Sequence, residues 1–122
     1  MTEPDFPISR LKIRPDFLAA AKAPSCARGA VVLQARDRAD DQPLVRVGFT
    51  ATRKVGGSVI RNRAKRRMRE AARQIVPLIG APGCDYVFIA RAGVITRPWA
   101  RLLDDMKSAL LRLAADRAAP QV

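Results

Sequence analysis

The sequence predicts an α+β sandwich in which helices cover a small sheet. Its 122 residues are the size of one domain with one core. Apolar, β-branched runs indicate three strands, and apolar residues at helical spacing indicate three helices, in the order helix, strand, strand, helix, strand, helix. We expect a single domain over residues 10–116, with a flexible arm at 1–9 and a frayed tail at 117–122.

The first half of the chain supplies one helix and two strands. Pro15 suits the first position of a helix, and the following Phe17 to Ala23 is rich in good helix formers. The run Ala30 to Ala35 has the composition of a mostly buried strand. Leu44 to Thr52 alternates apolar with polar residues, which suits an antiparallel strand with one covered face.

A second helix is expected to follow this strand. Gly56 and Gly57 break the strand, Ser58 is a suitable N-cap, and Pro77 is expected to end the helix after about Val76. On a helical wheel one stripe is apolar and should pack on the domain: Ile60, Ala64, Met68, Ala71 and Ile75. The opposite face is polar and is left to solvent or a ligand: Asn62, Arg66, Arg69 and Arg73, flanked by Arg63 and Lys65.

The last third of the chain completes the sheet and the helical layer. Asp85 to Ala90 is the most strand-like run in composition, so we expect it at the centre of the sheet. A third helix is expected from Pro98 to about Asp116, with Thr96 as a possible cap. If the strands on either side of the basic helix are neighbours, they pair in parallel, and the general rule predicts a right-handed crossover.

The charge balance points to a polyanion as the partner. The chain carries 23 basic and 11 acidic residues, a formal charge of +12. Nine basic residues and one acid lie between Arg53 and Arg73. Nucleic acid is therefore the first partner to consider. An anionic membrane is a weaker candidate, because the chain has no long apolar run. The N-terminal residues lack the pattern of a signal peptide, so we expect a cytoplasmic location.

Two classes of enzyme chemistry are disfavoured by composition. The chain has no histidine, and Cys26 and Cys84 form no CxxC pair. Neither a zinc site nor a Cys-His nucleophile can be assembled from these residues. We therefore expect no catalytic residue and no metal site on this chain.

The basic segment favours phosphate binding over a merely solvated surface. Arginine, which dominates here, binds phosphate with a planar fork that lysine lacks. Gly56 and Gly57 add backbone amides at the start of a helix, a second kind of anion site. A solvated face without a ligand is the alternative. A DNA-binding helix-turn-helix is disfavoured, because strands flank the basic helix on both sides.

The order of these residues resembles the protein subunit of bacterial ribonuclease P. The resemblance is carried by RVGFTATRKVGGSVIRNRAKRRMRE, from Arg46 to Glu70, and more loosely by Leu11 to Phe17 and Asp85 to Gly93. It implies a two-layer sandwich of the ribosomal protein S5 domain 2-like type. That fold has a sheet of about four strands, three helices and an unusual left-handed βαβ crossover.

The resemblance also implies a function. The family protein binds the catalytic RNA of ribonuclease P and helps it remove the 5′ leader from precursor tRNA. Hydrolysis is carried by the RNA subunit and by Mg²⁺ that the RNA mainly binds. The implied partners are that RNA and precursor tRNA, with no DNA and no membrane. A non-catalytic basic RNA-binding protein, such as a ribosomal or assembly factor, is the alternative.

Site residues follow from the resemblance by position. The resemblance places Arg61, Asn62, Arg63, Lys65, Arg66 and Arg69 at the RNA subunit, with Lys54 beside them. The charge of the segment and the helical wheel add Arg53 and Arg73 to this RNA-facing group. The cleft for the single-stranded leader comprises Phe17, Phe49 and Thr52. Two positions that are commonly aromatic in the family are small here, at Ala20 or Ala21 and at Ala30 or Val31, so the cleft should hold a leader less by stacking and more by charge. Tyr86 and Trp99 are expected in the core.

Overall fold

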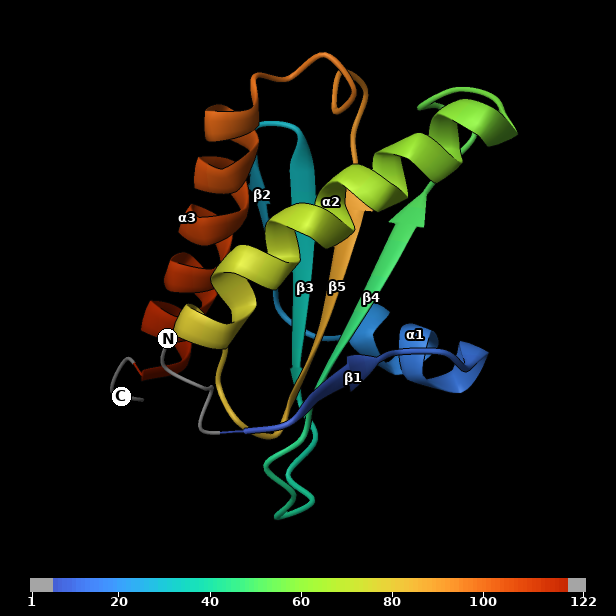
Figure 1. Ribbon diagram of the computed structural model, residues 1–122. Helices are drawn as coiled ribbons and strands as arrows, with labels where there is room; N and C mark the ends of the chain where they lie inside the picture. The colour runs from blue at the N-terminus through green and yellow to red at the C-terminus, as the bar shows by residue number, and fades with distance from the viewer. Residues whose placement is uncertain (1–5, 119–122) are drawn as a thin grey trace.

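The computed structural model, which describes residues 6–118, has a five-stranded mixed sheet and three helices (Figure 1). The strand order is β1-β4-β5-β3-β2. The strands are β1 (Ile8–Arg10), β2 (Ser25–Arg28), β3 (Val31–Asp37), β4 (Val45–Ala51) and β5 (Cys84–Ala90). The helices are α1 (Arg14–Ala21), α2 (Ser58–Ile79) and α3 (Trp99–Ala118). The predicted α+β class is confirmed.

Strand β5 occupies the centre of the sheet, as its composition predicts. It pairs in parallel with β4 and antiparallel with β3, and all but one of its residues are buried. Strand β4 is parallel to both of its neighbours, so the antiparallel expectation for it is wrong. With α2 in front of the sheet and both strands running upward, β5 lies to the left of β4 (Figure 1). The β4-α2-β5 crossover is therefore left-handed, against the general rule.

Two short edge strands were not expected from the sequence. Strand β1 pairs in parallel with β4, from Ile8 opposite Val45 onward, and β2 pairs antiparallel with β3. Both are short, exposed or half-buried, and lack an apolar repeat, so neither carries the sequence pattern of a strand. Of the expected arm, Phe6 is buried, residues 8 and 9 lie in the sheet, and residues 1–5 lie outside the described residues. Of the expected tail, residues 117 and 118 belong to α3 and the others lie outside the described part.

Helix α2 is longer than its sequence suggests. Gly57, not Ser58, is the N-cap, and its carbonyl accepts the N–H of Arg61 at 2.9 Å. Pro77 lies inside the last turn instead of ending the helix. Proline removes only the N–H that would reach the carbonyl of Arg73, and that residue is exposed, so water can satisfy the carbonyl. The helix ends where the N–H of Gly80 donates to the carbonyl of Val76 at 2.8 Å.

The core has two parts, on opposite faces of the sheet. Helices α2 and α3 cover one face, where Phe88, Met68 and Met106 are fully buried. Helix α1 covers part of the other face through a small cluster of Leu11, Ala20 and Val87. Because adjacent residues of a strand point to opposite faces, Val87 and Phe88 belong to different clusters.

A buried carboxylate fixes the strands at the α1 face. The sheet register places Asp85 between Arg36 of β3 and Arg46 of β4. Arg46 donates two hydrogen bonds to this carboxylate, at 2.8 and 2.7 Å, and Arg38 donates one at 2.8 Å. Arg46 also reaches Asp16 of α1 at 2.9 Å. Hydrogen bonding to Asp85 raises the pKa of Arg46 above its ordinary value. These arginines are therefore structural cations.

Candidate nucleic-acid interface

Helix α2 separates into a packed and an open face, largely as the helical wheel predicts. Ala64, Met68, Ala71 and Ile75 are buried. Ile60 was expected on this stripe but is 37% exposed. Its side chain instead folds back against Gly56, where an added Cβ would come within 2.8 Å of it. The packed face therefore begins one turn later than expected.

The open face of α2 presents cations that the protein does not neutralise. Asn62, Arg63, Arg66 and Arg73 are exposed, and Arg53, Lys54 and Thr52 are exposed in the segment just before the helix. Arg73 forms an exposed ion pair with Glu70 at 2.7 Å. Within residues 6–118, the side chains of Asn62, Arg63 and Arg66 have no hydrogen bond or ion pair. Their donors are therefore available to an external ligand.

The basic residues on the flanks of α2 have different roles. Arg61, Lys65 and Arg69 are half-buried. Arg69 was expected on the open face, but its guanidinium instead lies 5.7 Å from the ring centre of Phe49. The Nε atoms of Arg61 and Arg69 are buried and have no hydrogen-bond partner among residues 6–118. Arg67 instead turns toward α3.

Arg67 clamps α2 to the segment between β5 and α3. It donates to the carbonyl of Val94, and its guanidinium lies 5.6 Å from the ring centre of Trp99. Trp99 is 36% exposed, so its assignment to the core is wrong. Tyr86 is buried as expected, and its hydroxyl accepts the N–H of Ala81 at 2.8 Å. The cation of Arg67 covers the Trp99 ring, so this arginine is structural.

The beginning of α2 offers backbone donors to an anion. Its N-cap, Gly57, makes no side-chain capping bond, and no acid lies in the first turn. A Cβ added at Gly57 would meet nothing within 4 Å, so the approach to this end is open. The expected backbone anion site is therefore accessible beside Arg61 and Asn62.

Phe17 and Phe49 meet at the exposed edge of β4. They belong to the two separate clusters on opposite faces of the sheet. Strand β1 ends at Arg10, and beyond it both rings line one hollow of about 380 Å³, which we call the edge hollow. Its cationic lining consists of Arg10, Lys12, Lys65 and Arg69. Thr52 is exposed beyond the end of β4 and does not line this hollow.

Arg10 and Lys12 were not among the expected site residues. They flank buried Leu11, whose N–H donates to the carbonyl of Val47 at 3.0 Å and so fixes the course of the chain past β4. The signal available in the sequence was the alternation of Arg10, Leu11 and Lys12 just before α1. These two cations reach the edge hollow only because β1 pairs with β4, a strand that lies 35 or more residues later in the chain. The alternation alone does not reveal such a long-range contact.

Gly48 makes room for the ring of Phe17. A Cβ at this position would lie 2.7 Å from two ring carbons of Phe17 and 3.1 Å from Leu11. We expect Gly48→Ala to lower the free energy of unfolding by about 1 to 3 kcal/mol, because the ring must move in a packed cluster. Urea denaturation measures this change. Gly57→Ser, at an open N-cap, is the control and should change stability by only about a few tenths of a kcal/mol.

Residues 6–118 contain neither a membrane-spanning helix nor a cluster of metal-ligating side chains. None of the helices between residues 6 and 118 is long and apolar enough to cross a membrane. Over the same residues, no group of three or more Cys, Asp or Glu side chains is arranged to hold a metal ion.

Comparison with known proteins identifies the family. A sequence model of the family Ribonuclease P matches residues 7–114. The ribonuclease P protein component of Caulobacter vibrioides is 68% identical over 107 residues, 88% of this chain and 72% of that protein. That of Ruegeria pomeroyi is 50% identical over 90% of each chain. The solved RNase P protein of Thermotoga maritima has a TM-score of 0.70 at 28% identity, over 84% of this chain and 96% of that one. The chain therefore belongs to the ribonuclease P protein family, a family of tRNA-processing proteins.

Proposed function

We propose that this chain binds the catalytic RNA of ribonuclease P and the 5′ leader of precursor tRNA, and assists removal of that leader. The observation that carries the proposal is the open face of α2, where Asn62, Arg63 and Arg66 are exposed and have no hydrogen bond or ion pair with any other described residue. In a chain with a formal charge of +12, such a face is suited to a structured phosphate backbone.

The residues of this face divide the work of binding RNA. The guanidinium groups of Arg63 and Arg66 offer paired donors to phosphate oxygens, and Arg53 and Lys54 extend the charge beyond the start of α2. The open amides near Gly57 add donors at the positive end of the helix. Asn62, which is neutral, is suited to a ribose hydroxyl or a base edge. The packed face of α2 holds this group rigid against the sheet.

We assign the single-stranded leader to the edge hollow. Phe17 and Phe49 are the aromatic side chains there, and four cations surround them. Aromatic stacking is worth about 1 to 3 kcal/mol per base, so two partly covered rings offer limited stacking. Arg10 and Lys12 supply additional charge for the backbone of the leader. Recognition in this chain is therefore weighted toward phosphate.

The chemical step is assigned to the RNA subunit and to Mg²⁺ bound there. The carboxylates near the interface do not suit a magnesium site, because those in residues 6–118 are not gathered into a group that could hold a metal ion. Asp16 is paired with Arg46 at 2.9 Å, and Glu70 with Arg73 at 2.7 Å. Magnesium prefers oxygen ligands that are free to coordinate it. The side chains of this chain therefore position RNA and perform no step of phosphodiester hydrolysis.

Reconstitution of cleavage tests the proposal. The purified protein is added to bacterial ribonuclease P RNA, and cleavage of precursor tRNA is followed over a magnesium titration. We expect the protein to lower the magnesium concentration needed for cleavage, because its cations replace part of the counterion charge. Binding to the RNA without any effect on cleavage would favour a non-catalytic RNA-binding protein. Absence of binding would refute both functions.

A further inference from the structure

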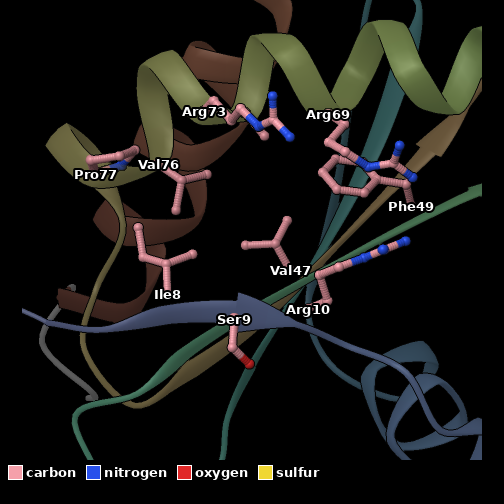
Figure 2. A pocket seen from close by; sticks show the side chains of 10 residues that line it. Ile8, Ser9, Arg10, Val47, Phe49, Arg69, Arg73, Val76 and Pro77 are labelled. Carbon is pink, nitrogen blue, oxygen red and sulfur yellow. The ribbon is translucent and has the colours of Figure 1, made fainter.

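A second pocket lies between β1 and α2, beside the edge hollow. Its volume is about 290 Å³, and we call it the β1-α2 pocket. Figure 2 shows Ile8 rising from β1 and Val76 descending from α2 toward it, with Val47 beside them. Phe49 closes the side toward the edge hollow, and Ser9 points away. The interior is therefore apolar, and no acidic side chain lines it.

Arginines surround the open side of this apolar pocket. Arg10 from β1 and Arg69 and Arg73 from α2 line it. Within the described residues, Arg10 has no side-chain hydrogen bond or ion pair. Arg69 lies over the Phe49 ring, and its buried Nε has no partner. Arg73 is held only by its exposed pair with Glu70. An apolar interior with a cationic rim suits a ligand that is flat and apolar at one end and anionic at the other.

An unpaired nucleotide has this chemistry. Unpaired bases are recognised by stacking on aromatic rings and on guanidinium planes, and their phosphates by arginine forks. The Arg69–Phe49 stack supplies such a surface at the boundary of the β1-α2 pocket and the edge hollow. A strand that lies in the edge hollow therefore has a base-sized apolar pocket next to its path.

We propose that the β1-α2 pocket binds one unpaired nucleotide of RNA, with the base between Ile8 and Val76 and the phosphate at Arg10 and Arg69. This inference rests on the proposed RNA-binding function. It extends the RNA-binding surface from the open face of α2 and the edge hollow to the β1-α2 pocket. It assigns roles to Ile8 and Val76, which the basic motif does not include, and places Arg10 at the rim of this pocket as well as of the edge hollow.

Filling the pocket tests this assignment. Ile8→Trp places a bulky ring in the apolar interior without removing a cation, and Ile8 is already 39% exposed on an edge strand. Leu78→Trp is the matched control, because Leu78 is 78% exposed at the end of α2 and does not line the pocket. Circular dichroism and urea denaturation show whether each variant is folded. Arg10→Gln tests the rim separately, with the exposed Arg101→Gln on α3 as its control.

The first readout is NMR of methyl-labelled protein titrated with a single-stranded RNA pentamer or with inorganic phosphate. We expect the pentamer, but not phosphate, to shift the methyl signals of Ile8, Val47 and Val76. Ile8→Trp should weaken pentamer binding about tenfold, as the loss of one stacked base implies, and Leu78→Trp should leave it unchanged. Unshifted methyl signals at saturating pentamer, or equal affinity of Ile8→Trp and wild type, would overturn the assignment.

The second readout identifies which RNA supplies the nucleotide. It also distinguishes failure of the pocket assignment from failure of the proposed function. Affinities of wild type and Ile8→Trp are compared for ribonuclease P RNA alone, and for precursor and mature tRNA on the assembled holoenzyme. A loss confined to precursor tRNA assigns the nucleotide to the leader, and a loss with the RNA alone assigns it to the RNA subunit. Wild type that binds RNA with no loss in Ile8→Trp refutes only the pocket, whereas wild type that binds no RNA refutes the proposed function.

Discussion

Replacing Asp85 with asparagine is expected to lower the free energy of unfolding by about 3 to 5 kcal/mol. The carboxylate is fully buried and accepts hydrogen bonds from Arg38 and Arg46, while Arg36 lies 3.6 Å away. Asparagine keeps the shape but not the charge, so Arg38 and Arg46 would keep only their weaker, more exposed partners Asp40 and Asp16. The buried carboxylate that joins the three arginines would be lost. Since small domains are stable by about 5 to 15 kcal/mol, the loss is a large fraction of the total.

Urea denaturation measures this effect, with Asp116→Asn as the control. Asp116 pairs with Arg112 at 3.3 Å on the surface of α3, where both side chains are more than half exposed. Removing such a pair costs less than about 1 kcal/mol. An Asp85→Asn variant within about 1 kcal/mol of wild type would show that the network does not hold β3, β4 and β5 together.

The double variant Arg63→Ala, Arg66→Ala is expected to bind ribonuclease P RNA about 30- to 150-fold more weakly than wild type. Both side chains are exposed on α2 and make no protein contact by hydrogen bond or ion pair within the described residues. At an exposed surface screened by salt, each arginine is expected to contribute about 1 to 1.5 kcal/mol, the upper part of the range for an ordinary net hydrogen bond, and the two losses add. Stability should be unchanged, because neither residue belongs to the packed face.

A charge-matched control removes two cations elsewhere. Arg101 and Lys107 are exposed on α3, away from the open face of α2, and their replacement by alanine lowers the net charge by the same amount. This control should keep most of the RNA affinity. Equal losses in the two double variants would mean that overall charge, and not the α2 face, governs binding.

The sequence predicted those elements whose identity depends on local pattern. The apolar run of β5 and the division of α2 into a packed and an open face are local properties, and the sequence pattern predicts most of both. Strands β1 and β2 have no such pattern, since they exist because β4 and β3 offer edges to them. The strand register sets the partners of Asp85, which no spacing along the chain reveals.

The part of the candidate site that lies on the open face of α2 could be predicted, because it is defined by a run of basic residues on one helix. Arg63 and Arg66 lie in the open as the wheel predicts, but Arg67 of the same basic run packs on Trp99. The cleft was less accessible to sequence reasoning, because Phe17 and Phe49 come from different faces of the sheet and meet only at an edge. The resemblance implies Phe17 in this cleft, whereas Arg10 reaches it only because β1 pairs with β4.

The most direct test of the central claim is the salt dependence of RNA affinity, measured in parallel for wild type and the Arg63→Ala, Arg66→Ala variant. If the open face of α2 contacts phosphates, the logarithm of affinity falls steeply with the logarithm of salt concentration for wild type. Each lost phosphate contact lowers that slope by about 0.7 to 0.9, so the variant should lose about 1.4 to 1.8 in all. Identical slopes for the two proteins would contradict the assignment of this face as the RNA-binding surface.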